Sequence, residues 1–254
     1  RMGKLPPITI VTPSFNQERF LTRTIESVLN QHYENLEYLV IDGGSTDGSI
    51  DIIRRYQDRL YYWVSEPDEG QADAIAKGFA RSTGQIMGWL NSDDLLLPGA
   101  LATVAQTFSR SRDIQMTYGD IVTVNEWGQM QNICTQTPAR FETLYYGSQI
   151  INQEAVFWTR DLYNRVGGLN RQLQYALDYD LWIRMSRVTM PHYIPVILAA
   201  FRQHPLQKSH RIDRYIDEMR LVQRQLRASM GEAAGSFAVK SGRWRAQVAL
   251  HRTA

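Results

Sequence analysis

The chain has 254 residues, of which 43% are apolar and 21% are charged, and its formal net charge is only +2. A chain of this length can bury a full hydrophobic core, and so balanced a charge argues against nucleic acid as a partner. The single cysteine, Cys134, excludes an internal disulfide framework and a cysteine-based zinc site. The longest apolar run, 194–201, is far shorter than a membrane-spanning helix, and no signal peptide is visible. We therefore expect a soluble, cytoplasmic protein of enzymatic size.

The first 110 residues alternate short apolar runs with stretches that carry apolar side chains at helical spacing. Strands are expected at residues 8–12, 36–41, 60–64 and 86–90. Helices are expected at residues 18–30, 49–56, 71–79 and 95–109. Because this alternation indicates βαβ units, it predicts an α/β fold with a mainly parallel, Rossmann-like sheet flanked by helices. We assign residues 1–110 to the first half of one domain.

Beyond residue 110 the pattern is mixed. The expected elements are a β-hairpin at 116–124 and 130–135, strands at 155–159 and 192–201, and helices at 160–166 and 178–188. We assign residues 111–210 to a smaller second half of the same domain. Residues 211–254 are predicted to form a basic helical tail, with helices at 211–229 and 237–250.

Polar and glycine-rich clusters follow four of the predicted strands. They lie at residues 12–14, 42–44, 66–70 and 92–94. In open parallel sheets, ligands bind in the crevice beyond the carboxyl ends of the strands. We therefore expect these clusters to face one crevice and to form the functional site.

Asp93 and Asp94 are adjacent carboxylates at one of these strand ends. Such a pair is unfavourable unless a cation lies between the charges, and carboxylate oxygens suit Mg²⁺ or Mn²⁺. The alternative is that one of them caps the following helix. Asp42 favours a metal-assisted site, because it lies at the end of a second strand in the same predicted crevice.

Several common catalytic motifs are absent from the sequence. It contains no Gly-x-Gly-x-x-Gly fingerprint, no Gly-x-x-x-x-Gly-Lys loop, no Gly-x-Ser-x-Gly elbow and no His-Glu-x-x-His motif. Dehydrogenase, P-loop kinase, serine hydrolase and zinc peptidase functions therefore lose their usual support.

Five blocks of sequence carry a resemblance to a known family. They are residues 8–16 (ITIVTPSFN), 41–49 (IDGGSTDGS), 68–74 (DEGQADA), 90–94 (LNSDD) and 178–184 (DYDLWIR). Together they closely resemble the family 2 glycosyltransferases of the GT-A fold, over residues 8–209. The resemblance implies an inverting enzyme that moves a sugar from a nucleoside-diphosphate-sugar of the UDP, dTDP or GDP type to an acceptor hydroxyl. It implies a place in bacterial polysaccharide or glycoconjugate synthesis.

The resemblance assigns a first group of residues to the nucleotide. The turn Thr12-Pro13-Ser14 matches the segment that borders the base. Asp42 matches the aspartate that contacts the nucleoside, and Asp73 lies in the block that lines the nucleotide pocket.

A second group is assigned to the metal and the diphosphate. Asp93 and Asp94 match the family's Asp-x-Asp-like motif, in which the first carboxylate faces the ribose and the second coordinates Mn²⁺ or Mg²⁺. His204, just beyond the last predicted strand, is a candidate metal ligand through a neutral ring nitrogen. The alternative is an ordinary loop histidine. Arg202 and Lys208 are candidates to neutralise phosphate charge.

Asp178 matches the aspartate of the family's Glu-Asp motif, which implies that it is the catalytic base, although Leu177 replaces the preceding glutamate. Asp180 is the alternative base. It lies four residues before Arg184 on one predicted helix, which favours an ion pair. We therefore expect Asp178 to take the proton from the acceptor hydroxyl, while the cation offsets charge on the departing nucleoside diphosphate.

The acceptor side gives weaker signals. Trp158 and Tyr175 are able to stack on a sugar, but aromatic residues at strand ends also pack in cores. The arginine-rich helix at 211–229 is able to touch anionic lipid, which would suit a lipid-linked acceptor and a peripheral position at the inner face of the membrane. The alternatives are a free saccharide acceptor and a helix packed by one face on the domain.

Two other functions compete with sugar transfer. A sugar-nucleotide nucleotidyltransferase also uses a parallel sheet and metal-binding carboxylates, but it needs a glycine-rich basic loop after the first strand, and residues 12–16 lack one. A non-catalytic module that binds nucleotide sugars would share the fold. An active transferase is favoured over such a module by the combination of four aspartates at the predicted site, Asp42, Asp93, Asp94 and Asp178.

Overall fold

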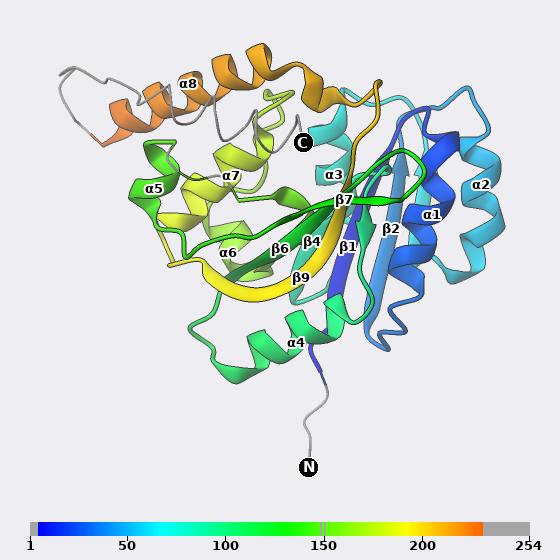
Figure 1. The fold of residues 1–254 in the computed structure, drawn as a ribbon, viewed down its shortest axis with the longest axis horizontal. Helices are drawn as coiled ribbons and strands as arrows, with labels where there is room; N and C mark the ends of the chain where they lie inside the picture. Colours follow the sequence, from blue (N-terminus) through cyan, green and yellow to red (C-terminus); the bar gives the residue numbers. More distant parts are fainter. Residues whose placement is uncertain (1–4, 148, 150, 231–254) are drawn as a thin grey trace.

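The computed structural model describes residues 5–147, 149 and 151–230 of the chain. In this part a nine-stranded sheet follows the order β3-β2-β1-β4-β8-β6-β9-β5, with β7 paired to β6 (Figure 1). The strands are β1 (Ile8–Ser14), β2 (Leu36–Asp42), β3 (Tyr62–Ser65), β4 (Ile86–Trp89), β5 (Leu95–Leu96), β6 (Met116–Val124), β7 (Met130–Cys134), β8 (Val156–Thr159) and β9 (His192–Arg202). The α-helices are α1 (Glu18–Leu29), α2 (Ser49–Tyr56), α3 (Gln71–Ala80), α4 (Ala100–Arg110), α5 (Phe141–Tyr145), α6 (Arg160–Arg165), α7 (Leu177–Ser186) and α8 (Ile212–Ser229).

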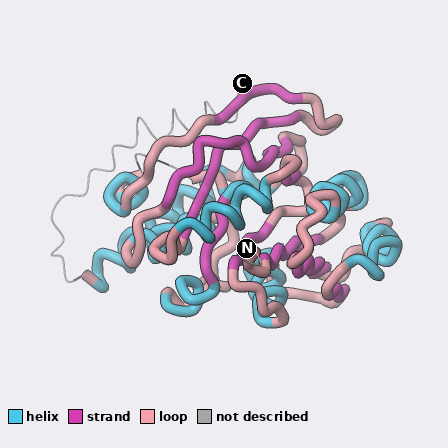
Figure 2. Tube along the Cα trace, turned by 90° about the horizontal axis from the view of Figure 1, so that it is seen from below, coloured by secondary structure: helices cyan, strands magenta, loops and turns pink. Residues whose placement is uncertain are grey.

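Strands β3, β2, β1 and β4 are parallel, and both of their faces are covered. Ile10 and Val40 pack on one face with α1, α2 and α4. Their chain neighbours Val11 and Leu39 pack on the other face, where α3, α7 and α8 contribute to the core. Helices therefore flank the strands, as Figure 2 shows in cyan beside magenta. The predicted α/β fold with a parallel sheet between helices is confirmed.

The second half continues the same sheet. β8 runs antiparallel to both β4 and β6 and joins the two halves. β6 pairs in parallel with β9 and forms the predicted hairpin with β7. Residues 1–110 and 111–210 thus contribute to one continuous sheet.

The helix predicted at residues 95–109 begins later than expected. Leu95–Leu96 forms the short strand β5, which pairs with residues 199–200 of β9, and α4 starts at Ala100. The reason is local, because Gly99 has a φ of 81°, a left-handed conformation that a helix interior excludes. The loop after β4 is thereby connected to β9.

Helix α8 packs by one face beside α7 (Figure 1). Met219, Val222 and Leu226 are buried in the core, whereas Arg220 and Asp217 form an ion pair on the exposed side. The sequence left open two possibilities for this helix, contact with lipid and packing by one face on the domain. The packing by one face is present. Within the described ranges, no helix combines the length and the apolar character that crossing a bilayer requires. The helix predicted at residues 237–250 lies outside the described residues.

Gly78 lies where α3 touches the sheet, and it provides a test of this packing. A Cβ at this position would lie 2.6 Å from Cγ1 of Val11 and 3.2 Å from Cγ1 of Ile41. Gly78→Val should therefore lower the free energy of unfolding by about 1–3 kcal/mol, measured by urea denaturation. Ala80→Val, at the exposed end of the same helix, is the control and should lose less than about 0.7 kcal/mol. Equal losses would contradict the close packing.

Candidate functional site

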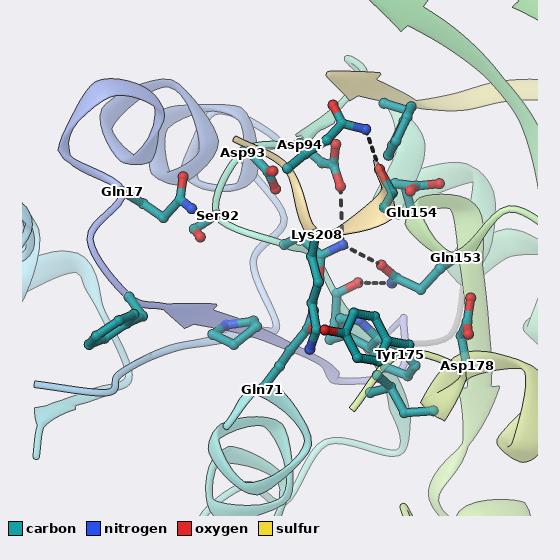
Figure 3. A pocket seen from close by; sticks show the side chains of 18 of the residues that line it. Gln17, Gln71, Ser92, Asp93, Asp94, Gln153, Glu154, Tyr175, Asp178 and Lys208 are labelled. Carbon is teal, nitrogen blue, oxygen red and sulfur yellow. Dashed lines mark hydrogen bonds between the residues drawn. The ribbon is translucent and has the colours of Figure 1, made fainter. Parts of the chain in front are cut away.

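A cavity of about 750 Å³ opens beyond the carboxyl ends of β1 and β4. Its wall combines the turn after β1 and the loop after β4 with the segment that leads into α7 and the loop after β9. Asp93 and Asp94 come from the first half, and Asp178 and Lys208 come from the second (Figure 3). The crevice that was expected at the strand ends is present, and both halves build it.

The structure divides the predicted site residues into two groups. Those that line the cavity are Pro13, Ser14, Asp93, Asp94, Asp178 and Lys208. Those that lie behind its wall, all buried, are Thr12, Asp42, Asp73, Arg202 and His204. The contacts of the second group show that these side chains hold the loops that form the wall.

Asp42 is fully buried beneath the glycine-rich loop after β2. Its carboxylate accepts hydrogen bonds from the N–H groups of Gly44 and Ser45, at 3.1 and 2.9 Å. It also accepts from the hydroxyls of Ser45 and Ser65, at 2.6 and 2.7 Å. These donors satisfy a buried carboxylate. Asp42 therefore orders the loop that carries Gly43 into the wall and does not itself face the cavity.

Thr12 and Asp73 also lie behind the wall. The hydroxyl of Thr12 is 3.0 Å from the hydroxyl of Tyr38 on the neighbouring strand. Asp73 lies 3.1 Å from Nζ of Lys77 and 3.4 Å from Nη1 of Arg171, so it joins α3 to the segment before α7. The first contact joins β1 to β2, and the contact with Arg171 joins α3 to the segment before α7. All of these elements adjoin the cavity wall.

Arg202 and His204 hold the Asp93–Asp94 loop from behind. The backbone N–H of Arg202 donates to Oδ1 of Asp94 at 2.9 Å, and its Nε donates to the carbonyl of Asp93 at 2.8 Å. The guanidinium also donates to two carbonyls of the β6–β7 turn and lies over the ring of Phe20. Nε2 of His204 is 2.9 Å from Oδ2 of Asp93. The two residues predicted to contact phosphate and metal thus both contact the acidic loop.

Asp94 lies in surroundings that oppose its charge. It is 1% exposed, and burial, together with repulsion from Asp93 and Glu154, raises the pKa of its carboxyl well above the usual value. Among the described residues, no three histidine, cysteine, aspartate or glutamate side chains are placed to hold a metal by themselves. The donor set does fit a divalent cation that takes one or two carboxylates here and its other ligands from phosphate oxygens.

A chain of amide side chains connects the acidic pair to the opposite wall (Figure 3). Nζ of Lys208 is 3.3 Å from Oε1 of Gln71, whose Nε2 donates to Oδ1 of Asn91 at 2.8 Å. Nδ2 of Asn91 donates to Oδ2 of Asp94 at 3.2 Å and to Oε1 of Gln153 at 3.0 Å. The sequence places Asn91 beside the acidic pair, but no spacing marks Gln71 or Gln153 as part of the same network.

Asp178 and Asp180 have different surroundings, although both lie in the first turn of α7. Nε of Arg184 donates to Oδ2 of Asp180 at 3.1 Å, so the expected ion pair is present. Asp180 is buried and lies outside the cavity lining, whereas Asp178 lines the cavity. The geometry therefore favours Asp178 for a reaction inside the cavity.

The loop after β9 brings Lys208 into the cavity. Its Nζ lies 5.2 Å from the ring centre of Tyr175, which also lines the cavity. Burial lowers the pKa of Lys208 below its usual value, although the negative charges of Glu218 and Asp178 oppose this shift. Trp158, the other aromatic candidate, is completely buried in the core, as its packing alternative predicted.

The fold and the cavity together define a class of protein. A parallel α/β half with a cavity at its strand ends, an acidic pair and a separate carboxylate in the wall is typical of an enzyme. Residues 9–167, more than half of the chain, match the family described as glycosyl transferase family 2. The chain belongs to this family and is a glycosyltransferase, which confirms the predicted family and enzyme class.

Curated relatives carry the same enzyme class. An uncharacterised glycosyltransferase of Mycobacterium tuberculosis is 28% identical over 202 residues, which cover 79% of this chain and 76% of the relative. Chondroitin synthase of Escherichia coli is 25% identical over 190 residues, which cover 74% of this chain and 27% of that enzyme. The chain thus spans about a quarter of chondroitin synthase.

Solved structures share the fold. Residues 1–349 of S. aureus TarS, in complex with UDP-GlcNAc, superpose with a TM-score of 0.73 at 14% identity, covering 96% of this chain and 72% of that one. A mannosyltransferase of Pyrobaculum calidifontis, in complex with GDP-Man and Mn²⁺, gives a TM-score of 0.67 at 19% identity, covering 97% and 70%. At these identities the likeness shows the GT-A fold alone.

Removing the Arg202 guanidinium should destabilise the site and the fold together. Arg202→Met leaves buried carbonyls without their donor and should lower the free energy of unfolding by about 2–4 kcal/mol. Arg19→Met is the matched control, because Arg19 contacts Glu126 of the same β6–β7 turn at 2.6 Å but is 56% exposed. Its loss should not exceed about 1 kcal/mol. Denaturant unfolding measures both, and similar losses would show that Arg202 does not hold the loop.

Proposed function

We propose that the protein is a metal-dependent, inverting glycosyltransferase that moves a sugar from a nucleoside-diphosphate-sugar to an acceptor hydroxyl. The observation that carries this proposal is the placement of Asp93, Asp94 and Asp178 in the wall of one cavity. An acidic pair suits a cation on a diphosphate, and a separate carboxylate suits a general base. Two proteins of the same fold were solved with UDP-GlcNAc and with GDP-Man, which supports a donor of this kind.

The nucleoside would lie against the turn after β1 and the loop after β2. Pro13, Ser14 and Gly43 line this part of the cavity. A Cβ on Gly43 would lie 2.6 Å from Oδ2 of Asp68, so the backbone of Gly43 lies close to the Asp68 carboxylate in this part of the wall. Asp68 lines the cavity and Asp42 does not, and we therefore assign to Asp68 the nucleoside contact that the sequence suggested for Asp42.

The metal, Mn²⁺ or Mg²⁺, would be held by Asp94 with Asp93, and the donor phosphates would supply the remaining ligands. When bound, it supplies electrostatic stabilisation of the charge on the departing nucleoside diphosphate. His204 and Arg202 orient the acidic loop. Lys208 enters the cavity and is placed to neutralise phosphate charge. The Mn²⁺ in the Pyrobaculum mannosyltransferase supports a metal-assisted reaction.

Asp178 would take the proton from the acceptor hydroxyl as that oxygen attacks the anomeric carbon. Attack from the face opposite the departing diphosphate inverts the configuration at that carbon. Asp180 is engaged by Arg184 outside the cavity lining, which supports Asp178 as the base.

The acceptor is proposed to be a saccharide, free or lipid-linked, in bacterial polysaccharide or glycoconjugate synthesis. Chondroitin synthase and hyaluronan synthase are among the curated relatives, and both are named for polysaccharides. Contact of α8 with the inner face of a membrane stays a prediction. Arg214 and Arg220 on this helix are paired with Asp213 and Asp217, which reduces their attraction to anionic lipid.

Nucleoside diphosphates should stabilise the protein in a metal-dependent manner. UDP, GDP and dTDP are titrated with and without Mn²⁺, and the matching nucleotide at 100 times its Kd should add about 2.7 kcal/mol to the free energy of unfolding. Asp94→Asn should abolish the Mn²⁺-dependent part. It should also stabilise the metal-free protein by about 1 kcal/mol, because it removes a charge that is opposed by burial and by repulsion from Asp93 and Glu154. Thermal-shift assays measure both effects, and no shift with any nucleotide would contradict the donor site.

Asp178→Asn should separate binding from chemistry. The amide cannot accept the proton, so kcat should fall by at least about 100-fold while the Kd for the nucleotide is unchanged. Asp180→Asn is the control, because it weakens the pair with Arg184 and should lower the melting temperature but retain turnover. Steady-state kinetics with the donor chosen by thermal shift compare the two. Full turnover by Asp178→Asn would place the base elsewhere.

A further inference from the structure

The segment that leads into α7 is bound by one carboxylate from the last described helix. Glu218 of α8 accepts hydrogen bonds from the backbone N–H groups of Gln174, Tyr175 and Ala176, at 2.9, 2.7 and 2.8 Å. The N-cap of α7 is Ala176, which has no side-chain acceptor. Glu218 therefore acts as a cap from 42 residues away in sequence, and its charge offsets the positive end of the helix dipole.

The bound segment carries or adjoins three groups of the cavity. Tyr175 lies within it, and its ring contacts Nζ of Lys208. Asp178 follows in the first turn of α7. The negative charge of Glu218 also acts on Lys208, where it partly opposes the lowering of the ammonium's pKa by burial. Figure 3 shows Tyr175, Lys208 and Asp178 around the same space, so a shift of this segment would move the base and the ring together.

A second contact from α8 holds α7 further along. Nε2 of Gln223 donates to the carbonyl of Tyr145 in α5 at 2.7 Å and to the hydroxyl of Tyr179 at 2.8 Å. Gln223 is buried. The start of α7 is therefore fixed from α8 at two points, by a carboxylate on the N–H groups before it and by an amide on its first turn.

We propose that Glu218 is a positioning residue for sugar transfer: it sets where Asp178 and Tyr175 stand in the cavity and so governs the chemical step without touching substrate. This inference rests on the proposed function, in which Asp178 is the base. Position 218 lies beyond residues 9–167, the part that the family match covers, and the match therefore assigns no role to it.

Glu218→Gln tests the inference with little change in side-chain volume. Glutamine offers one acceptor oxygen and no charge, so at least one of the three N–H groups loses its partner. We expect kcat to fall by about 10–100-fold, the effect of a displacement of about 1 Å. The KM for the donor and the Kd for UDP, GDP or dTDP with Mn²⁺ should stay within about threefold. Asp217→Asn is the matched control, because this neighbouring carboxylate is 71% exposed, and its kcat should change less than about twofold.

Hydrogen–deuterium exchange gives a second measurement that needs no substrate. In Glu218→Gln the amides of residues 174–176 should exchange at least about tenfold faster, while those of β1 and β2 are unchanged. Unchanged exchange at 174–176 would overturn the cap. Wild-type kcat in this variant, or an equal loss of kcat and of nucleotide affinity, would overturn the positioning role. A failure of the proposed function looks different, because the wild-type protein then binds none of the three nucleotides, and both proposals fall together.

Discussion

The buried guanidinium of Arg202 is the contact on which the rest of the site depends. It holds the backbone of Asp93, while the N–H of the same residue holds the carboxylate of Asp94. Through the same side chain, the loop after β4 is joined to β9 and to the β6–β7 turn. Two neighbouring carboxylates would otherwise repel each other and turn towards water. Because Arg202 and His204 hold Asp93 and Asp94 from behind, both aspartates stay in the cavity wall. A cation bound there would lower the free-energy cost of burying their charges.

The fold was predictable where one physical constraint dominates a segment. Strands β1, β2 and β4 are covered on both faces, and such strands give continuous apolar runs that a sequence displays directly. The start of α4 was not predictable in this way, because the apolar periodicity runs through residues 95–109 without a break. The left-handed backbone of Gly99 is what delays the start of the helix to Ala100. The short helix α5 was not predicted either, because its five residues are too few to show a helical period.

The residue types of the site were predictable, but the directions of several side chains were not. A sequence shows that Asp42, Arg202 and His204 lie at or just beyond strand ends, yet a polar group there can face a ligand or a neighbouring loop. The outcome depends on partners that arrive from distant segments. The hydroxyl of Ser65 in β3 donates a hydrogen bond to Asp42. The ring of His204 forms a hydrogen bond with Asp93 in the loop after β4. The amide chain through Gln71 and Gln153 has the same character, because it forms only when three segments that are distant in sequence meet.

Several supports of the site lie outside the part of the chain that the family match covers. Residues 9–167 contain the acidic pair, but Arg202 and His204 come from β9 and the loop after it, and Glu218 comes from α8. A chain cut after β8 would therefore retain Asp94 without the N–H that it accepts from Arg202. It would also lack α7 and with it Asp178. The C-terminal third thus supplies both the proposed base and the donors that keep the first half's carboxylates in place, so neither half has a complete reaction site alone.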